Sequence, residues 1–221
     1  MKDREDALAL LLAEISACRI CRDRPDGGPE RRLPHEPRPV CFASARAPIL
    51  IAGQAPGTRV HASGKPFTDP SGDRLRTWLG VEAEQFYDPD KFAIVPMGFC
   101  FPGNDANGGD LPPRRECAPA WRGLVMDRMP QVRLVLAIGQ YAQAWHLGPL
   151  RQKSLTETVY NWREILAATG PERPVLPLPH PSWRNSGWIR KNPWFEAELL
   201  PELRQRVVTL ISPGVGTNSS S

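Results

Sequence analysis

The decapeptide PILIAGQAPG, residues 48–57, decides the fold. A run of apolar residues ends at Gly53, and a short turn-forming segment that closes with Gly57 follows it. An apolar run without alternation is typical of a strand in a parallel sheet that helices cover on both faces. Three similar runs follow, at residues 92–97, 134–139 and 175–180. The sequence therefore predicts four parallel strands.

Segments with helical periodicity lie between these strands and at both ends of the chain. We expect helices at residues 3–17, 73–79, 117–129, 141–147, 156–168 and 195–210. Alternation of strand and helix favours an α/β fold, a three-layer α/β/α sandwich with a central four-stranded parallel sheet. A chain of 221 residues, 41% of them hydrophobic, can form one domain with its own core. We assign residues 1–212 to that domain and expect residues 213–221 to form a flexible tail.

The composition narrows the class of protein. The apolar content excludes a wholly disordered or collagen-like chain. No stretch approaches the roughly 18 apolar residues of a membrane-spanning helix, and the N-terminal apolar run lacks a signal-peptide cleavage site. We therefore expect a cytoplasmic protein with reduced cysteines. The net charge of +4 fits a solvated surface as well as a nucleic-acid-binding surface.

The loops after the strands matter most, because ligands of open parallel sheets bind beyond the carboxyl ends of the strands. In the first loop, Gly53 and Gly57 permit a tight turn, and Pro56 stiffens it. Gln54 can hydrogen-bond a nucleobase edge or hold a water molecule. Phe67, in the next loop, can stack on a base or pack in the core. Taken alone, an ordinary turn also explains the first loop.

The segment HPSWRN, residues 180–185, follows the fourth strand. His180 can donate a hydrogen bond to a developing oxyanion. Ser182 and Arg184 can bind a phosphate, and Trp183 or Arg184 can enter a base stack. A structural histidine in a surface turn is the alternative.

Four of the five cysteines form two pairs, Cys18 with Cys21 and Cys100 with Cys117, and Cys41 stands alone. A C-x2-C motif in a reducing environment favours metal binding over a disulfide. Four thiolates can hold a [4Fe–4S] cluster or a structural zinc ion. Buried cysteines without a ligand remain the alternative.

In this order, the motifs resemble those of the uracil-DNA glycosylase superfamily, most closely its iron–sulfur-containing branch, family 4. In that branch a C-x2-C motif precedes G-E-A-P-G, then a loop of the pattern G-x-P-F-x-G-x-x-G-x-x-L, two further cysteines and an H-P-S or H-P-A motif. The corresponding parts here are Cys18 and Cys21, residues 53–57, residues 64–75, Cys100 and Cys117, and residues 180–182. HPSWRN also resembles the H-P-S-P-R-N of the single-strand-selective monofunctional branch.

The resemblance implies a monofunctional DNA-repair glycosylase of base excision repair. Such an enzyme flips a deaminated base, uracil in the first place, out of DNA and hydrolyses its N-glycosidic bond. His180 would hydrogen-bond the leaving base, and Gln54 would place the attacking water. The substrate-binding residues would be Gly53, Ala55, Pro56, Gly57, Phe67, Ser182, Arg184 and Asn185.

The resemblance also implies partners and a cofactor. Cys18, Cys21, Cys100 and Cys117 would hold a structural [4Fe–4S] cluster, with zinc as the alternative. The partner would be single- or double-stranded DNA that contains a deaminated base. We expect a monomer of bacterial type that associates with the nucleoid and not with a membrane.

Two departures from the family pattern leave the substrate open. Gln54 replaces the family's glutamate, and Pro96 replaces an asparagine that recognises the pyrimidine edge. Asp69 and Asp73 can replace the lost carboxylate or merely cap the following helix, and His61 can face the pocket or the solvent. The alternatives are a glycosylase for hypoxanthine or xanthine, a protein that binds damaged bases with little turnover, and an unrelated zinc-stabilised enzyme.

Overall fold

The computed structural model describes residues 2–212 and contains one four-stranded sheet in that range. Its strands are β1 (Ile49–Ala52), β2 (Phe92–Ile94), β3 (Leu134–Ile138) and β4 (Val175–Leu178). All neighbours pair in parallel, in the order β2-β1-β3-β4. Every strand residue is buried, which confirms the prediction from the continuous apolar runs. The predicted flexible tail, residues 213–221, lies outside the described residues.

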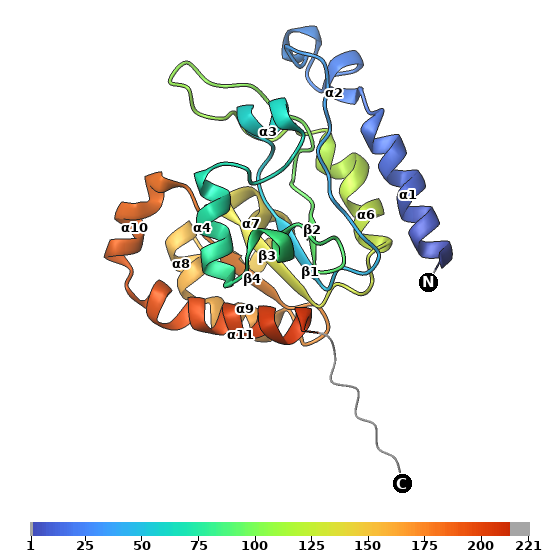
Figure 1. The fold of residues 1–221 in the computed structure, drawn as a ribbon. Coiled ribbons are helices and arrows are strands. Elements are labelled where there is room, and N and C mark those ends of the chain that lie inside the picture. Colours follow the sequence, from blue (N-terminus) through green and yellow to red (C-terminus); the bar gives the residue numbers. More distant parts are fainter. Residues whose placement is uncertain (1, 213–221) are drawn as a thin grey trace.

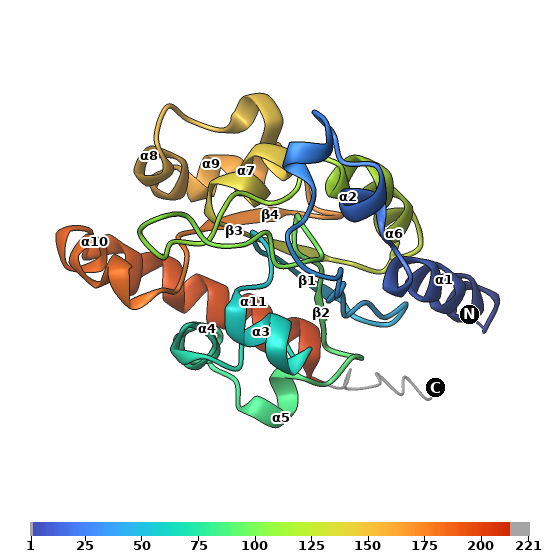
Figure 2. The same cartoon turned by 90° about the horizontal axis from the view of Figure 1, so that it is seen from above.

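Helices cover both faces of the sheet (Figures 1 and 2). Ile49 and Ile51 of β1 point to one face, and Leu50 and Ala52 point to the other. The first face packs against α4 (Pro70–Leu79), α5 (Ala83–Phe86), α8 (Leu155–Tyr160) and α11 (Leu200–Ile211). The second face packs against α1 (Lys2–Ser16), α6 (Gly123–Asp127) and α7 (Gly139–Leu147), whereas α9 (Trp162–Ala168) contributes to both cores. The three-layer α/β/α sandwich is therefore confirmed.

Some helix boundaries differ from the prediction. The segment 156–168 forms two helices, α8 and α9, which meet at Asn161. The segments 117–129 and 195–210 each begin with a π-helical stretch, Ala118–Arg122 and Phe195–Leu199. The sequence analysis missed α2 (Ile20–Asp23), α3 (Thr58–Ser63), α5 and α10 (Ser186–Lys191). These helices are four to six residues long, which is too short to display a helical period.

The strand order creates a crevice at the carboxyl edge of the sheet. The chain passes from β1 to β2 on one side of β1, and β3 then pairs with the other side. Such a reversal separates the loops that leave the neighbouring strands, and ligands bind in the resulting crevice. No helix within residues 2–212 has the length and the apolar character required to cross a membrane.

The loop that contains Phe67 packs directly against the first turn of α4. Phe67 has a φ of 55°, which is rare for a residue with a side chain. Its carbonyl oxygen accepts hydrogen bonds from the Tyr87 hydroxyl at 3.0 Å and the Arg76 guanidinium at 3.2 Å. A Cβ atom at Gly72 would lie 1.8 Å from that same oxygen. Only glycine therefore permits this close approach.

The first prediction concerns this contact. Gly72→Ala should lower the free energy of unfolding by about 2 kcal/mol or more, because the added methyl group forces the Phe67 loop away from α4. Gly123→Ala is the matched control, since Gly123 is helical and a Cβ there would have no neighbour within 4 Å. The control should be neutral or stabilising by up to ~1 kcal/mol. Denaturant unfolding followed by circular dichroism measures both, and equal stabilities would contradict the prediction.

Candidate functional site

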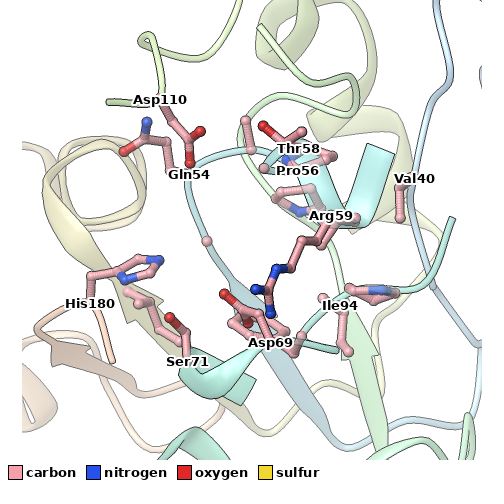
Figure 3. Close-up of a pocket in the computed structure, with 18 residues that line it drawn as sticks. Val40, Gln54, Pro56, Thr58, Arg59, Asp69, Ser71, Ile94, Asp110 and His180 are labelled. Atoms are coloured by element: carbon pink, nitrogen blue, oxygen red, sulfur yellow. The ribbon is translucent and has the colours of Figure 1, made fainter. Parts of the chain in front are cut away.

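A cavity of about 290 Å³ lies at the carboxyl edge of the sheet (Figure 3). The loop after β1 forms one wall, and the Phe67 loop forms another. Ile94 and Pro96, at the end of β2, supply an apolar wall, and His180 enters after β4. The cavity therefore occupies the crevice that the strand order creates.

Most of the residues expected from the sequence meet in this cavity. Its lining includes Gly53, Gln54, Ala55, Pro56, Gly57, Phe67 and His180. Ser182, Arg184 and Asn185 do not line it. The Asn185 amide donates to the His180 carbonyl oxygen at 2.7 Å, and the Ser182 hydroxyl accepts from the Arg184 backbone at 3.3 Å. These residues shape the loop that holds His180.

Trp183, which lies in the same loop, faces the solvent. The side chain of Trp183 is 70% exposed, and the guanidinium of Arg184 lies 5.7 Å from the centre of its ring. An exposed indole beside a cation is available to contact a partner surface.

His180 is a neutral hydrogen-bond donor in this arrangement. The backbone N–H of Ser182 donates to His180 Nδ1 at 3.2 Å, so the proton of the neutral ring is assigned to Nε2. The ring points into the cavity (Figure 3). Burial lowers the pKa of His180 below its usual value, and Asp69 and Asp110 offset part of this effect. The ring can therefore donate from Nε2 without carrying a charge.

Gln54 and Asp110 also line the cavity (Figure 3). Gln54 Nε2 donates to the backbone carbonyl oxygen of Leu111 at 3.1 Å. The side-chain oxygen of Gln54, Oε1, remains available. The Asn104 amide donates to Asp110 Oδ1 at 3.2 Å. A Cβ atom at Gly57 would lie 3.2 Å from Asp110 Oδ2, so the carboxylate lies close to the first loop. Asp110 thus brings a carboxylate to the cavity, whereas position 54 holds a glutamine in place of the glutamate of the family pattern.

The three other candidates named from the sequence occupy different places. Asp69 lines the cavity, and it also caps α4 by accepting from the Gly72 backbone at 3.2 Å. Asp73 does not line the cavity; its side chain is 77% exposed and pairs with Arg76. His61 packs against His35, with ring centres 4.4 Å apart and the ring planes tilted by 51°, and does not line the cavity either. Of these three, only Asp69 can act in the cavity.

The sequence analysis missed Asp110 and Arg59, which both line the cavity. Asp110 lies in an irregular loop, and Arg59 lies in the short helix α3. Neither segment has a periodic pattern that could have placed its side chains. No signal in the sequence distinguished them from solvated surface residues.

A second, smaller cavity is lined by Cys18, Cys21, Cys100 and Cys117, whereas Cys41 is absent from its lining. The Trp121 indole donates to Cys18 Sγ, and the Phe99 backbone donates to Cys117 Sγ, each at 3.2 Å. The Arg114 side chain and the Arg38 backbone lower the pKa values of Cys21 and Cys100, respectively, against the larger effect of burial. Burial raises the pKa of Cys100 to about 12. Hydrogen bonds from the protein therefore reach two of the four sulfurs, Cys18 and Cys117.

Within residues 2–212, no three side chains of histidine, cysteine, aspartate or glutamate are grouped closely enough to hold a metal ion. Four sulfurs around one zinc ion each lie about 2.3 Å from it, and hence about 3.8 Å from one another. The four cysteines line one cavity, and their chemistry suits either a zinc ion or an iron–sulfur cluster.

Arg122 links the two cavities. Its side chain is fully buried, and Nη1 donates to the carbonyl oxygens of Val95 at 2.7 Å and Pro96 at 3.0 Å. Among the described residues Arg122 forms no salt bridge, although its charge acts on Cys41 and Cys117. Burial lowers the pKa of Arg122 to about 10. A buried cation without a carboxylate partner is costly unless an anion lies nearby.

Comparison with known protein families gives one match. Residues 41–204, well over half of the chain, match the model of the uracil DNA glycosylase superfamily. The matched range includes all the residues of the first cavity that come from the loops after the four strands. It includes Cys100 and Cys117 and leaves out Cys18 and Cys21.

Proposed function

Because the chain belongs to the uracil DNA glycosylase superfamily, we propose that it removes a deaminated base, uracil in the first place, from DNA. The reaction is hydrolysis of the N-glycosidic bond without strand cleavage. The observation that carries this proposal is the neutral His180, whose Nε2–H is available to the same cavity that Phe67 lines. A flipped base requires a stacking surface and a donor for its developing charge.

Phe67 supplies the stacking surface. Its backbone is held in a strained conformation by Tyr87 and Arg76, so the ring has little freedom to move. A preorganised ring lowers the entropy cost of ordering the base.

His180 stabilises the leaving group. When the bond from C1′ to the base nitrogen breaks, its electron pair enters the base, and a carbonyl oxygen of the base becomes more negative. A hydrogen bond from His180 Nε2 to that oxygen strengthens as the charge develops. One such donor contributes about 3 kcal/mol to transition-state stabilisation.

Gln54 and Asp110 hold the attacking water. The side-chain oxygen of Gln54 accepts a hydrogen bond from the water. The Asp110 carboxylate takes a proton from the water as the water oxygen bonds to C1′. Asp110 thereby supplies the carboxylate that the family 4 motif G-E-A-P-G carries where this chain has Gln54. Its exposed position at the mouth of the cavity gives the water access from the solvent.

The loop after His180 contacts the DNA in this proposal. Trp183 can fill the gap that the flipped nucleotide leaves in the base stack. Arg184 and Ser182 can bind the flanking phosphates.

We also propose that the four cysteines of the second cavity hold a [4Fe–4S] cluster. In such a cluster each cysteine binds a different iron, and four cysteines line the second cavity. The charge of Arg122 favours an anionic group there. The cluster would be structural, since base removal needs no electron transfer, and it would join the N-terminal segment to the loop between Cys100 and Cys117.

The first functional prediction tests the activity. The protein should excise uracil from single- or double-stranded DNA, so that alkali then cuts the strand. His180→Ala should lower the excision rate by a factor of about 100, because the leaving group loses its donor. Unchanged activity would remove His180 from the mechanism. Tight binding of uracil-containing DNA by the native protein, without cutting, would instead favour a damage-binding protein, a possibility that Gln54 and Pro96 raise.

A second functional prediction concerns the water. Asp110→Asn keeps the shape of the side chain and its contact with Asn104 but removes the proton acceptor. Excision should fall by about 100-fold or more, while binding to DNA that carries a non-cleavable 2′-fluoro-2′-deoxyuridine should stay within about twofold. An equal loss of binding and excision would show that Asp110 serves the fold or the DNA contact.

A third prediction concerns the cluster. The purified protein should be brown and should contain iron and sulfide. Cys100→Ser should lose most of the colour and lower the melting temperature, because one ligand of a structural group is gone. Cys41→Ser is the matched control and should keep the colour, since Cys41 does not line the cavity. A colourless native protein that contains zinc, or colour that depends on Cys41 alone, would contradict the proposal.

A further inference from the structure

An arginine and a carboxylate converge on the same part of the first cavity. Arg59 projects from α3, and Asp69 stands at the N-terminus of α4. Both side chains line the cavity, and Figure 3 shows the guanidinium of Arg59 extending toward Asp69.

The neighbouring wall cannot recognise a polar ligand with its side chains. Ile94, Pro96 and Val40 line it, and none of them carries a side-chain donor or acceptor. The carbonyl oxygens of Val95 and Pro96 are already bound by Arg122. A base whose N–H and C=O groups faced only this wall would lose hydrogen bonds to water without compensation. The polar groups for the far edge of a base must come from other elements.

Arg59 and Asp69 have the unused capacity to supply these groups. Among residues 2–212, Arg59 forms no salt bridge, and no hydrogen bond of its side chain is present. The guanidinium can only donate, and the ionised carboxylate can only accept. Asp69 uses Oδ1 to cap α4 at 3.2 Å from the Gly72 nitrogen, which leaves Oδ2 available.

The order of these groups around the cavity is also defined. Of the charged groups near His180, Asp69 raises the pKa of the ring most, and Asp110 raises it less. In Figure 3 Asp69 lies between His180 and the guanidinium of Arg59. The cavity therefore presents a donor at His180, then an acceptor at Asp69, then a donor at Arg59.

We propose that Arg59 and Asp69, together with His180, recognise the carbonyl, N–H, carbonyl edge that deamination creates. In uracil these groups are O2, N3–H and O4, which match His180, Asp69 and Arg59 in that order. Cytosine presents a bare N3 to Asp69 and an amino group to Arg59, so acceptor meets acceptor and donor meets donor. This inference rests on the proposed function and assigns the substrate class of the same site.

The match extends beyond uracil. Xanthine carries the same edge of two carbonyls around an N–H group, whereas hypoxanthine carries one carbonyl and one N–H. The pair therefore favours uracil and xanthine over hypoxanthine, and it rejects cytosine and adenine. Thymine shares the edge of uracil, so its exclusion depends on the walls around its methyl group and not on Arg59 or Asp69.

A binding experiment tests the inference without using catalysis. Single-stranded oligonucleotides carry one 2′-fluoro-2′-deoxyuridine or one 2′-fluoro-2′-deoxycytidine, which resist cleavage and differ only in the base. The native protein should bind the uracil strand about 10- to 100-fold more tightly than the cytosine strand. This is the range expected when cytosine loses a charge-assisted hydrogen bond or places a donor against a donor. Arg59→Ala and Asp69→Asn should each reduce this ratio to within about threefold of one.

The variants are chosen to separate recognition from other roles. Asn caps helices as well as Asp does, so Asp69→Asn should retain α4. Asp73→Asn makes the same chemical change four residues on, outside the cavity, and should keep the native ratio. Arg59 is exposed, so Arg59→Ala tests the inference even if the Asp69 variant does not fold.

The outcomes are distinct. If Arg59 serves only as a phosphate contact, Arg59→Ala weakens both strands equally and leaves the ratio unchanged, which overturns the inference. A native protein that excises uracil but binds both strands equally also overturns it. A native protein that prefers the uracil strand through Arg59 and Asp69 but never excises the base supports the inference and contradicts the proposed catalysis.

Discussion

The buried guanidinium of Arg122 is the constraint on which both cavities depend. It fixes the end of β2 through the carbonyl oxygens of Val95 and Pro96, and it belongs to the π-helical stretch that follows Cys117. His146 accepts a further hydrogen bond from it at 2.5 Å. Burial lowers the pKa of His146 to about 3, so this acceptor stays neutral under ordinary conditions. Without the guanidinium, two buried carbonyl groups would lose their partner at the wall of the first cavity.

The sheet could be predicted from the sequence because parallel strands are buried along their whole length. Residues such as Leu50 and Val135 cannot alternate with polar residues when helices cover both faces. The short helices α3 and α10 could not be predicted, since six residues do not complete two turns. The break at Asn161 also escaped prediction, because the apolar pattern continues across it.

The candidate site was predicted where it follows directly from a strand. Gly53, Gln54 and His180 stand at strand ends, and the sheet topology alone brings strand ends together. Asp110 and Arg59 come from segments whose positions depend on tertiary contacts, such as the hydrogen bond between Gln54 and Leu111. The two departures from the family pattern, Gln54 and Pro96, marked positions where a functional group of the family, a carboxylate or an asparagine amide, was missing. They did not reveal which segments would replace it.

The loop between Cys100 and Cys117 has a consequence for how the protein would fail under oxidation. This loop carries Asp110, the proposed proton acceptor, and Leu111, which binds Gln54, whereas Phe67 and His180 belong to elements anchored on the sheet. Loss of the proposed cluster would release the loop and leave the sheet intact. The chain would then still bind a flipped base but no longer hydrolyse its bond. Under the proposed function, oxidation of the cluster would therefore separate base binding from bond hydrolysis, so that the damaged protein would remain bound at lesions that it no longer removes.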